Sequence, residues 1–244
     1  MPNSSASHNG NLVSFDELIT GVKGFGGNYN PANVLLKIPA LEAKSTAAHN
    51  AMSKMNTIEM VYRVDVERRT VIYQPVNWIV TRIFNFIKSS GASQVIIDQV
   101  ATNIGKLKGK RAGKKLLPPA EGELKEVPQQ ISVSQMGFDD RLNNFDKLIR
   151  QLELIPEYQP NENDLNTKAL RDLWNKMDHA NKAVLNSETD LSNARIARNI
   201  EFYTKGTGLT EIGRADKLYI KAAFGSKSPQ YLQVAKLRFR TYAN

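Results

Sequence analysis

Apolar residues recur at intervals of three and four along most of the chain, which is the spacing of one face of an α-helix. The clearest set lies in residues 76–87, where valines, isoleucines and Phe84 follow this spacing. Pro75 precedes the set and Ser89-Ser90-Gly91 follows it, so we predict a helix between them. A longer helical pattern covers residues 40–71, and a further segment covers 93–104.

The region before residue 40 has a different pattern. Ser14 and Glu17 fit a capping box for a short opening helix. Glycines crowd residues 21–27 without the Gly-Lys-Ser/Thr sequence of a phosphate-binding loop, so we predict a mobile connector there.

The second half of the chain has a long helical pattern in which Leu170, Met177, Val184 and Leu191 recur every seven residues. A partner series with small residues runs beside them. This pattern predicts close packing against another long helix at a shallow angle. Pro156 ends an opening helix before it, and Asn163 or Asp164 can cap it. Further helices are predicted over 209–224 and from Ser228-Pro229, followed by an alternating tail at 237–240.

The two halves also resemble each other when the chain is shifted by 130 positions. Phe15-Asp16-x-Leu18-Ile19 returns as Phe145-Asp146-x-Leu148-Ile149, and ten of the 59 ungapped positions from 15 to 73 are identical. Chance would give roughly three or four. After Tyr203 the shift becomes 134, as expected from a loop insertion in a tandem duplication.

These patterns predict an all-α protein made by tandem duplication of a helical unit, with the long amphipathic helices packed as a pseudo-symmetric bundle. We expect a disordered tail over 1–13 and repeat units over 14–105 and 135–240. Residues 106–134 are expected to form a basic and then proline-rich linker.

Composition excludes several classes of protein. The chain of 244 residues has 41% hydrophobic residues and no cysteine, which excludes disulfides, thiolate metal sites and cysteine nucleophiles. No apolar run reaches the roughly 18 residues of a membrane helix. The first ten residues lack the pattern of a secretory signal, so we expect a cytoplasmic protein.

The net charge of +9 favours an anionic partner, and one cluster carries most of it. Residues 106–115 hold six positive charges and no acid, and removing them leaves +3. The candidate nucleic-acid or anionic-surface residues are Lys106, Lys108, Lys110, Arg111, Lys114 and Lys115. Such a cluster binds phosphates with little choice of sequence, and the alternative is a solubilising linker.

Two matched pairs are candidates for other chemistry. His49 and His179 could face each other, but the residues three positions earlier are Thr46 and Lys176 instead of the Glu of a di-metal bundle. We therefore predict no metal site and no cofactor. Arg68 and Arg198 each precede a tyrosine by five residues. They could form a pair of anion-binding sites, or they could be structural residues that bond carbonyl groups at helix ends.

Two strings resemble those of uncharacterised bacterial helical proteins. They are Ser192-Asn193-Ala194-Arg195-Ile196-Ala197-Arg198-Asn199 and Phe224-Gly225 followed by Ser228-Pro229-Gln230-Tyr231. The resemblance covers about residues 160–240. It implies a helical fold and carries no activity.

The sequence contains no recognisable catalytic constellation, so we expect a protein that is not an enzyme. The primary prediction is a structural or protein-interaction module that binds a protein partner or associates with itself as an oligomer-forming subunit. The alternative is a non-specific nucleic-acid-binding protein that uses the cluster at 106–115. A helical toxin that rearranges in membranes would need an apolar hairpin, for which residues 76–87 are the sole short candidate.

Overall fold

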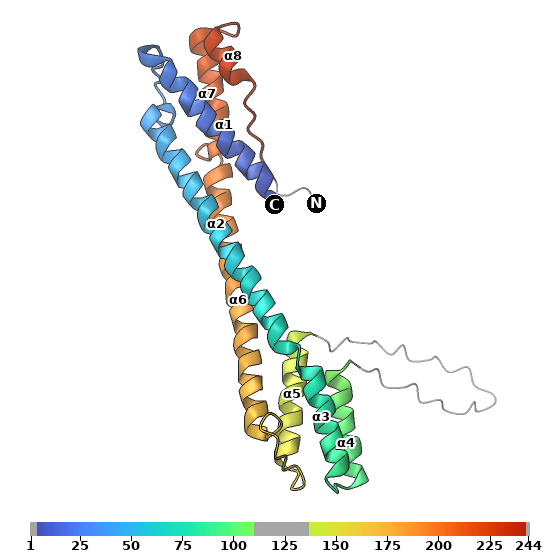
Figure 1. Ribbon diagram of the computed structural model, residues 1–244. Helices are drawn as coiled ribbons and strands as arrows, with labels where there is room; N and C mark the ends of the chain where they lie inside the picture. The colour runs from blue at the N-terminus through green and yellow to red at the C-terminus, as the bar shows by residue number, and fades with distance from the viewer. Residues whose placement is uncertain (1–3, 110–136, 243–244) are drawn as a thin grey trace, which may run out of the picture. The chain divides into compact units, whose positions relative to one another are not determined.

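The computed structural model describes residues 4–109 and 137–242, and all regular secondary structure in these ranges is helical. The chain forms two compact units. Unit 1 consists of Met1–Arg63 and Ser187–Asn244, and unit 2 of Val64–Asn186. Two long helices, α2 (Ile38–Tyr73) and α6 (Thr167–Tyr203), each contribute residues to both units (Figure 1).

Unit 1 is built around α1 (Ser4–Gly24), which contacts α7 (Leu209–Phe224) and α8 (Pro229–Ala235). Two short 3₁₀ turns, η1 (Gly26–Asn28) and η2 (Val34–Leu36), connect α1 to α2. The unit's core collects apolar residues from all of these helices, and it includes the buried side chains Phe15, Leu18, Leu41, Phe202, Ile212, Leu237 and Phe239.

Within unit 1 the long helices run antiparallel. Lys44 near the start of α2 forms an ion pair of 2.9 Å with Glu201 near the end of α6. Further along α2, Met55 packs with Leu191 and Ala194. Of the heptad series that predicted a long-helix partner, Leu191 lies in this contact, whereas Leu170 and Met177 are buried in the core of unit 2.

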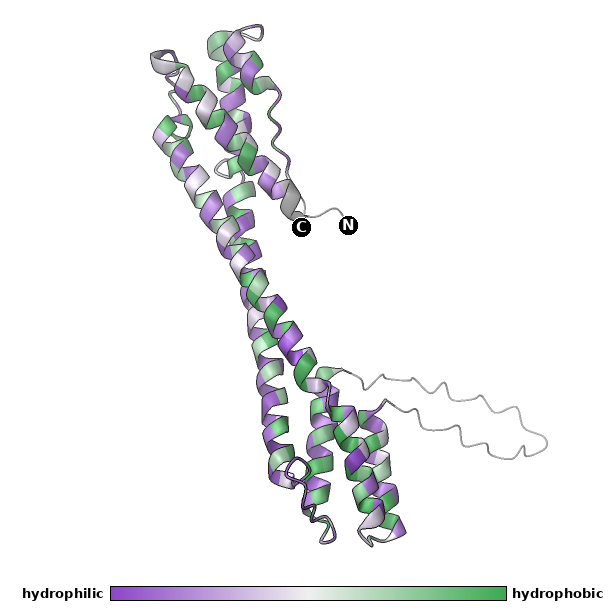
Figure 2. Cartoon of the chain, in the orientation of Figure 1, coloured by the Kyte–Doolittle hydropathy of each residue, from purple (hydrophilic) through white to green (hydrophobic). Residues whose placement is uncertain are grey.

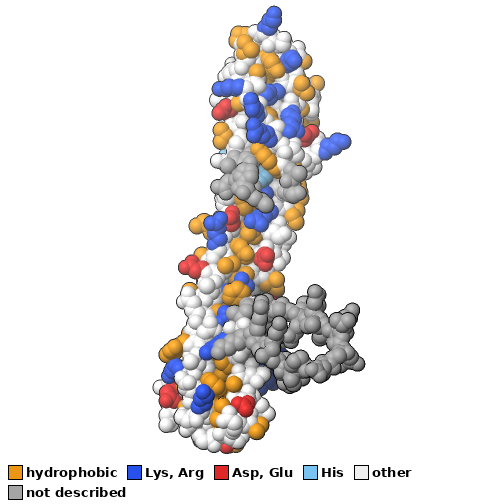
Figure 3. All heavy atoms as spheres, turned by 90° about the vertical axis from the view of Figure 1, so that its right-hand side faces the viewer, with side chains coloured by type: hydrophobic (Ala, Val, Ile, Leu, Met, Phe, Trp, Pro, Cys, Tyr) orange, Lys and Arg blue, Asp and Glu red, His pale blue; other side chains and the backbone are white. Residues whose placement is uncertain are grey.

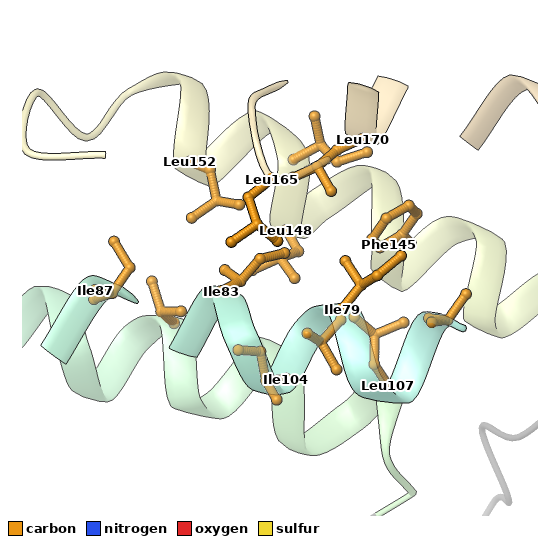
Figure 4. Packing of buried hydrophobic residues seen from close by; sticks show 14 of the residues in the cluster. Ile79, Ile83, Ile87, Ile104, Leu107, Phe145, Leu148, Leu152, Leu165 and Leu170 are labelled. Carbon is orange, nitrogen blue, oxygen red and sulfur yellow. The ribbon is translucent and has the colours of Figure 1, made fainter. Parts of the chain in front are cut away.

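Unit 2 packs α3 (Val76–Ser89), α4 (Gln94–Leu107) and α5 (Phe138–Glu153) around one apolar core. Figure 4 shows isoleucines of α3 and α4 interlocking with leucines of α5. Ile83, Ile87 and Leu148 are fully buried there. The predicted helix over 76–87 is confirmed, and Figure 2 shows hydrophobic residues in green interspersed with hydrophilic ones in purple along the helices of this unit.

Three local expectations are wrong. The predicted tail over 1–13 is helical from Ser4, because His8, Asn11 and Leu12 are buried in unit 1 and these contacts override a composition poor in helix formers. Ser14 therefore lies inside α1 and caps nothing. The long helix α6 is capped by Asn166, whose Oδ1 accepts from the Ala169 amide at 2.8 Å, instead of by Asn163 or Asp164.

The compact units do not coincide with the predicted repeat units over 14–105 and 135–240. Unit 1 contains the first part of one repeat and the last part of the other, and unit 2 contains the remaining parts. The predicted linker overlaps α4, which ends at Leu107, and residues 110–134 of the linker lie outside the described residues. None of the described helices is long and apolar enough to cross a membrane.

Candidate functional site

Only two of the six cations predicted at 106–115 fall within the described residues. Lys106 is exposed in the last turn of α4, and Lys108 donates from Nζ to Thr81 Oγ1 at 2.6 Å. The other four residues, Lys110, Arg111, Lys114 and Lys115, lie outside the described part of the chain. The described part therefore does not test this cluster.

The matched arginines have different environments. Arg68, in unit 2, is exposed and pairs with Asp65 at 3.1 Å. Arg198, in unit 1, is buried and donates from Nη2 to Asn199 Oδ1 at 2.8 Å, and burial lowers the pKa of its guanidinium. Neither donates to helix C-terminal carbonyls in the described structure, and the two belong to different compact units.

The matched histidines are also separated. His49, in unit 1, lies with Nε2 2.8 Å from Asp16 Oδ2, whereas His179 is an exposed residue of unit 2. No group of three or more His, Asp or Glu side chains suited to a metal ion occurs among residues 4–109 and 137–242.

The structure shows a basic groove on unit 1 that the sequence analysis did not identify. Beyond Lys236, the C-cap of α8, the chain is extended, with Leu237 and Phe239 buried and Arg238 and Arg240 exposed. This alternation arises because successive side chains of an extended chain point to opposite sides. The segment thus turns its apolar side chains into the core and its cations outward.

Side chains of α7 and α1 hold this segment in place through hydrogen bonds to its backbone. Lys217 donates from Nζ to the carbonyl oxygens of Ala235, at 2.9 Å, and Leu237. Arg214 donates from Nη2 to the Phe239 carbonyl at 2.7 Å. On the other side, Asn11 donates to the Arg240 carbonyl at 2.7 Å and accepts from its amide at 2.9 Å.

A close approach of the segment to α7 occurs at Gly213. A Cβ atom on this glycine would lie 2.6 Å from the Phe239 ring, so any side chain would collide with it. Gly213 therefore lets the ring lie directly on the helix backbone.

The groove beside this segment has a volume of about 520 Å³. Its lining combines four cations with apolar and aromatic side chains: Arg214, Lys217, Leu218, Tyr231, Leu237, Arg238, Phe239 and Arg240. Figure 3 shows blue Lys and Arg side chains gathered on this part of unit 1. We call this feature the C-terminal groove.

The cations of the C-terminal groove have two different roles. Arg214 pairs with Glu211 at 2.7 Å in addition to its backbone bonds, and burial lowers the pKa of Lys217. Both are thus engaged in holding the segment. Arg238 and Arg240 are exposed, and within the described part of the chain neither pairs with a carboxylate.

A sequence signal for this groove existed. Residues 206–244 contain seven Lys or Arg and only two Asp or Glu, a second concentration of charge besides the cluster at 106–115. The alternating tail at 237–240 was predicted, and Leu237 and Phe239 are buried whereas Arg238 and Arg240 are exposed. What the sequence could not show is that α7 and Asn11 hold this tail beside a hollow.

Unit 1 also buries an acid. The Asp216 side chain is fully buried, its Oδ1 lies 2.6 Å from Tyr29 Oη, and its Oδ2 has no hydrogen-bond partner. Burial raises the pKa of Asp216 to about 6, although the Tyr29 hydrogen bond lowers it. Among the described residues, Asp216 is thus hydrogen-bonded through Oδ1 to Tyr29, whose hydroxyl also contacts the carbonyl of Leu36.

No protein family matches this chain, and no curated protein or solved structure shows significant similarity to it.

Proposed function

We propose that the protein is a non-enzymatic structural or interaction module made from two copies of one helical unit that have exchanged their halves. The helices occur in the same order in each copy. Helices α1, α2, α3 and α4 correspond to α5, α6, α7 and α8. The long helices α2 and α6 have 36 and 37 residues, and α3 and α7 have 14 and 16.

Matched hydrogen bonds support this correspondence. Tyr29 lies within hydrogen-bonding distance of the carbonyl of Leu36, seven residues later, and Tyr158 donates to the carbonyl of Leu165, also seven residues later. Each tyrosine follows the first helix of its copy. The same bond thus closes the same connection in both copies.

Matched ring contacts support an exchange between the copies. Tyr29 contacts Tyr219 edge-on at 5.4 Å, and Tyr158 contacts Phe86 edge-on at 5.3 Å, both at an interplanar angle of 83°. In each contact one ring follows the first helix of its copy, and the other lies on the third helix of the opposite copy. Exchange of equivalent elements is the arrangement known from domain-swapped dimers.

The repeated motif behaves alike in both units. Phe15 and Phe145 are fully buried, and the aspartate that follows each of them contacts the long helix of the same copy. Asp16 accepts from Ser45 and lies 2.8 Å from His49 of α2, and Asp146 accepts from Arg171 of α6. The contacts Tyr29–Tyr219 and Tyr158–Phe86 are the observation that carries the proposal, because in each of them the first copy and the second copy exchange roles.

Cleavage between the copies tests the exchange. A protease site placed between Pro118 and Pro119, in the predicted linker, separates the chain into its two copies. If the halves are exchanged, the fragments stay associated and unfold together, because each compact unit needs helices from both. Fragments that separate and remain folded would contradict the exchange, and the uncut protein with the same insertion is the control.

Exposed apolar residues of unit 1 support self-association. Met60 and Val61 of α2 and Ile196 and Ile200 of α6 are each more than half exposed. Large exposed apolar residues on helices are typical of interaction surfaces when they gather. Light scattering tests this part of the proposal. A dimer that Ile196→Ser/Ile200→Ser converts to monomer supports it, and a strictly monomeric wild type contradicts it.

The nucleic-acid alternative through residues 106–115 has its own test. Neutralising Lys106, Lys108, Lys110, Arg111, Lys114 and Lys115 should abolish a gel shift if this cluster binds phosphates. A gel shift unchanged by the six substitutions removes the alternative.

A further inference from the structure

We infer that the C-terminal groove of unit 1 binds single-stranded nucleic acid, with Arg238 and Arg240 on its phosphates and Tyr231 against a base. The inference does not depend on the exchange of halves, because every residue of the groove lies in one compact unit.

The exposed cations Arg238 and Arg240 form a short row. They are two residues apart on the extended segment, so their Cα atoms are spaced by roughly 6.6 Å along one side of it. Two cations at this spacing match successive phosphates of a chain better than they match a single small anion. Guanidinium groups also bind phosphate oxygens through two hydrogen bonds at once.

The row is held in place before any ligand binds. Arg214 and Lys217 donate to three carbonyls of the segment, and Asn11 forms two bonds with the Arg240 backbone. These three are positioning residues, since their own polar atoms are occupied. Ordering the segment in advance reduces the entropy lost on binding.

The groove also has an apolar side suited to a base. Tyr231 is half-buried on α8, and Leu218 on α7 is largely exposed. Lys221 Nζ lies 5.7 Å from the centre of the Tyr231 ring, which adds a cation at the edge of this surface. Basic grooves with an aromatic face are typical of single-strand binding, because duplex bases are already stacked on each other.

Fluorescence anisotropy with a labelled oligo-dT tests the inference on the full chain. Arg238→Gln/Arg240→Gln removes two exposed cations, and Lys54→Gln/Arg195→Gln removes two other exposed cations of unit 1 as a control of equal charge. Loss of two phosphate contacts lowers the slope of log affinity against log salt by about 1.4. We expect affinity near 0.1 M salt to fall roughly tenfold or more, and the control to change less than about twofold.

Tyr231→Leu separates stacking from charge. Leucine keeps much of the packing against the core but cannot stack on a base, so affinity should fall about tenfold with an unchanged salt slope. Circular dichroism melting of each variant shows that the fold is intact. The paired result, a slope change for the arginines and none for Tyr231, is specific to the proposed contacts.

Several outcomes would overturn the inference. They are a wild type that binds no oligonucleotide, a salt slope equal in the two double variants, or binding abolished only by neutralising residues 106–115. Equal affinity for duplex would overturn the single-strand assignment. Binding to phosphatidylserine vesicles without binding to oligo-dT would assign the groove to membranes instead.

Discussion

Tyr29 Oη lies 2.6 Å from Oδ1 of Asp216 inside unit 1, and the same hydroxyl also reaches the carbonyl of Leu36. A tyrosine hydroxyl has a single proton and can donate to only one of these acceptors. Both contacts are satisfied when Asp216 is protonated, because the acid then donates to Tyr29 and Tyr29 donates to Leu36. The geometry and the raised pKa of Asp216, about 6, agree on a neutral acid in mildly acidic solution.

Asp216→Asn should stabilise the protein at neutral pH. Because the folded pKa of Asp216 lies above its unfolded value, the folded state holds the proton more tightly between about pH 4 and pH 6. The acid therefore costs stability as pH rises through this window, by roughly 2–3 kcal/mol. We expect the stability gain of Asp216→Asn in urea unfolding to grow from pH 4 to pH 6 and then level off.

The difference between wild type and Asp216→Asn removes the titration of all other groups. Asp146, whose burial alone would raise its pKa, is held below its usual value by Arg150 and Arg171, and it acts in the opposite direction on acidification. A difference curve that is flat between pH 4 and pH 7 would contradict a buried acid of raised pKa.

Tyr29→Phe and Tyr158→Phe should differ in cost although they remove equivalent bonds. Tyr158 donates to the Leu165 carbonyl alone among the described residues, so its loss should cost about 1 kcal/mol. Loss of the Tyr29 hydroxyl also leaves Asp216 without its partner, which should cost about 2–4 kcal/mol at pH 7. Urea unfolding of both variants checks the order, and equal costs would show that Asp216 gains nothing from Tyr29.

Gly213→Ala should destabilise unit 1 and disturb the C-terminal groove. The added methyl would lie 2.6 Å from the Phe239 ring, and overpacking of this kind costs about 1–3 kcal/mol. Phe239→Leu, which shortens the side chain facing position 213, should recover part of the lost stability when it is combined with Gly213→Ala. Additive destabilisation in the double variant would show that the two residues do not meet as described.

The helices of this protein could be predicted from periodicity because their buried faces are continuous. The helix at 76–89 and the heptads of α6 were found this way. The beginning of α1 was not, since His8 and Asn11 are polar and are buried only through partners about 195 and 229 residues away. Local composition carries no trace of such contacts.

The C-terminal groove was hidden for a similar reason. Its exposed cations alternate visibly along the sequence, but the residues that hold them, Arg214, Lys217 and Asn11, come from two other helices. The division into compact units was missed because the repeat suggested that each copy folds on itself. Sequence repeats show that two segments are alike, and they do not show which half of one packs against which half of the other.

His8→Phe should stabilise the protein most at acidic pH. His8 is buried beside Tyr203, and burial, followed by the charge of Arg198, lowers the pKa of its imidazole to about 4. Between about pH 6.5 and pH 4 the unfolded chain takes up the proton and the folded chain does not, so wild type loses stability as pH falls. Phenylalanine, which stands at the matched position 138 beside Tyr73, has no such titration.

We expect the stability of His8→Phe relative to wild type to rise by roughly 2 kcal/mol from pH 7 to pH 4.5, measured by urea unfolding. This trend is opposite in sign to that of Asp216→Asn, so a stability gain of His8→Phe that falls on acidification would contradict the lowered pKa of His8.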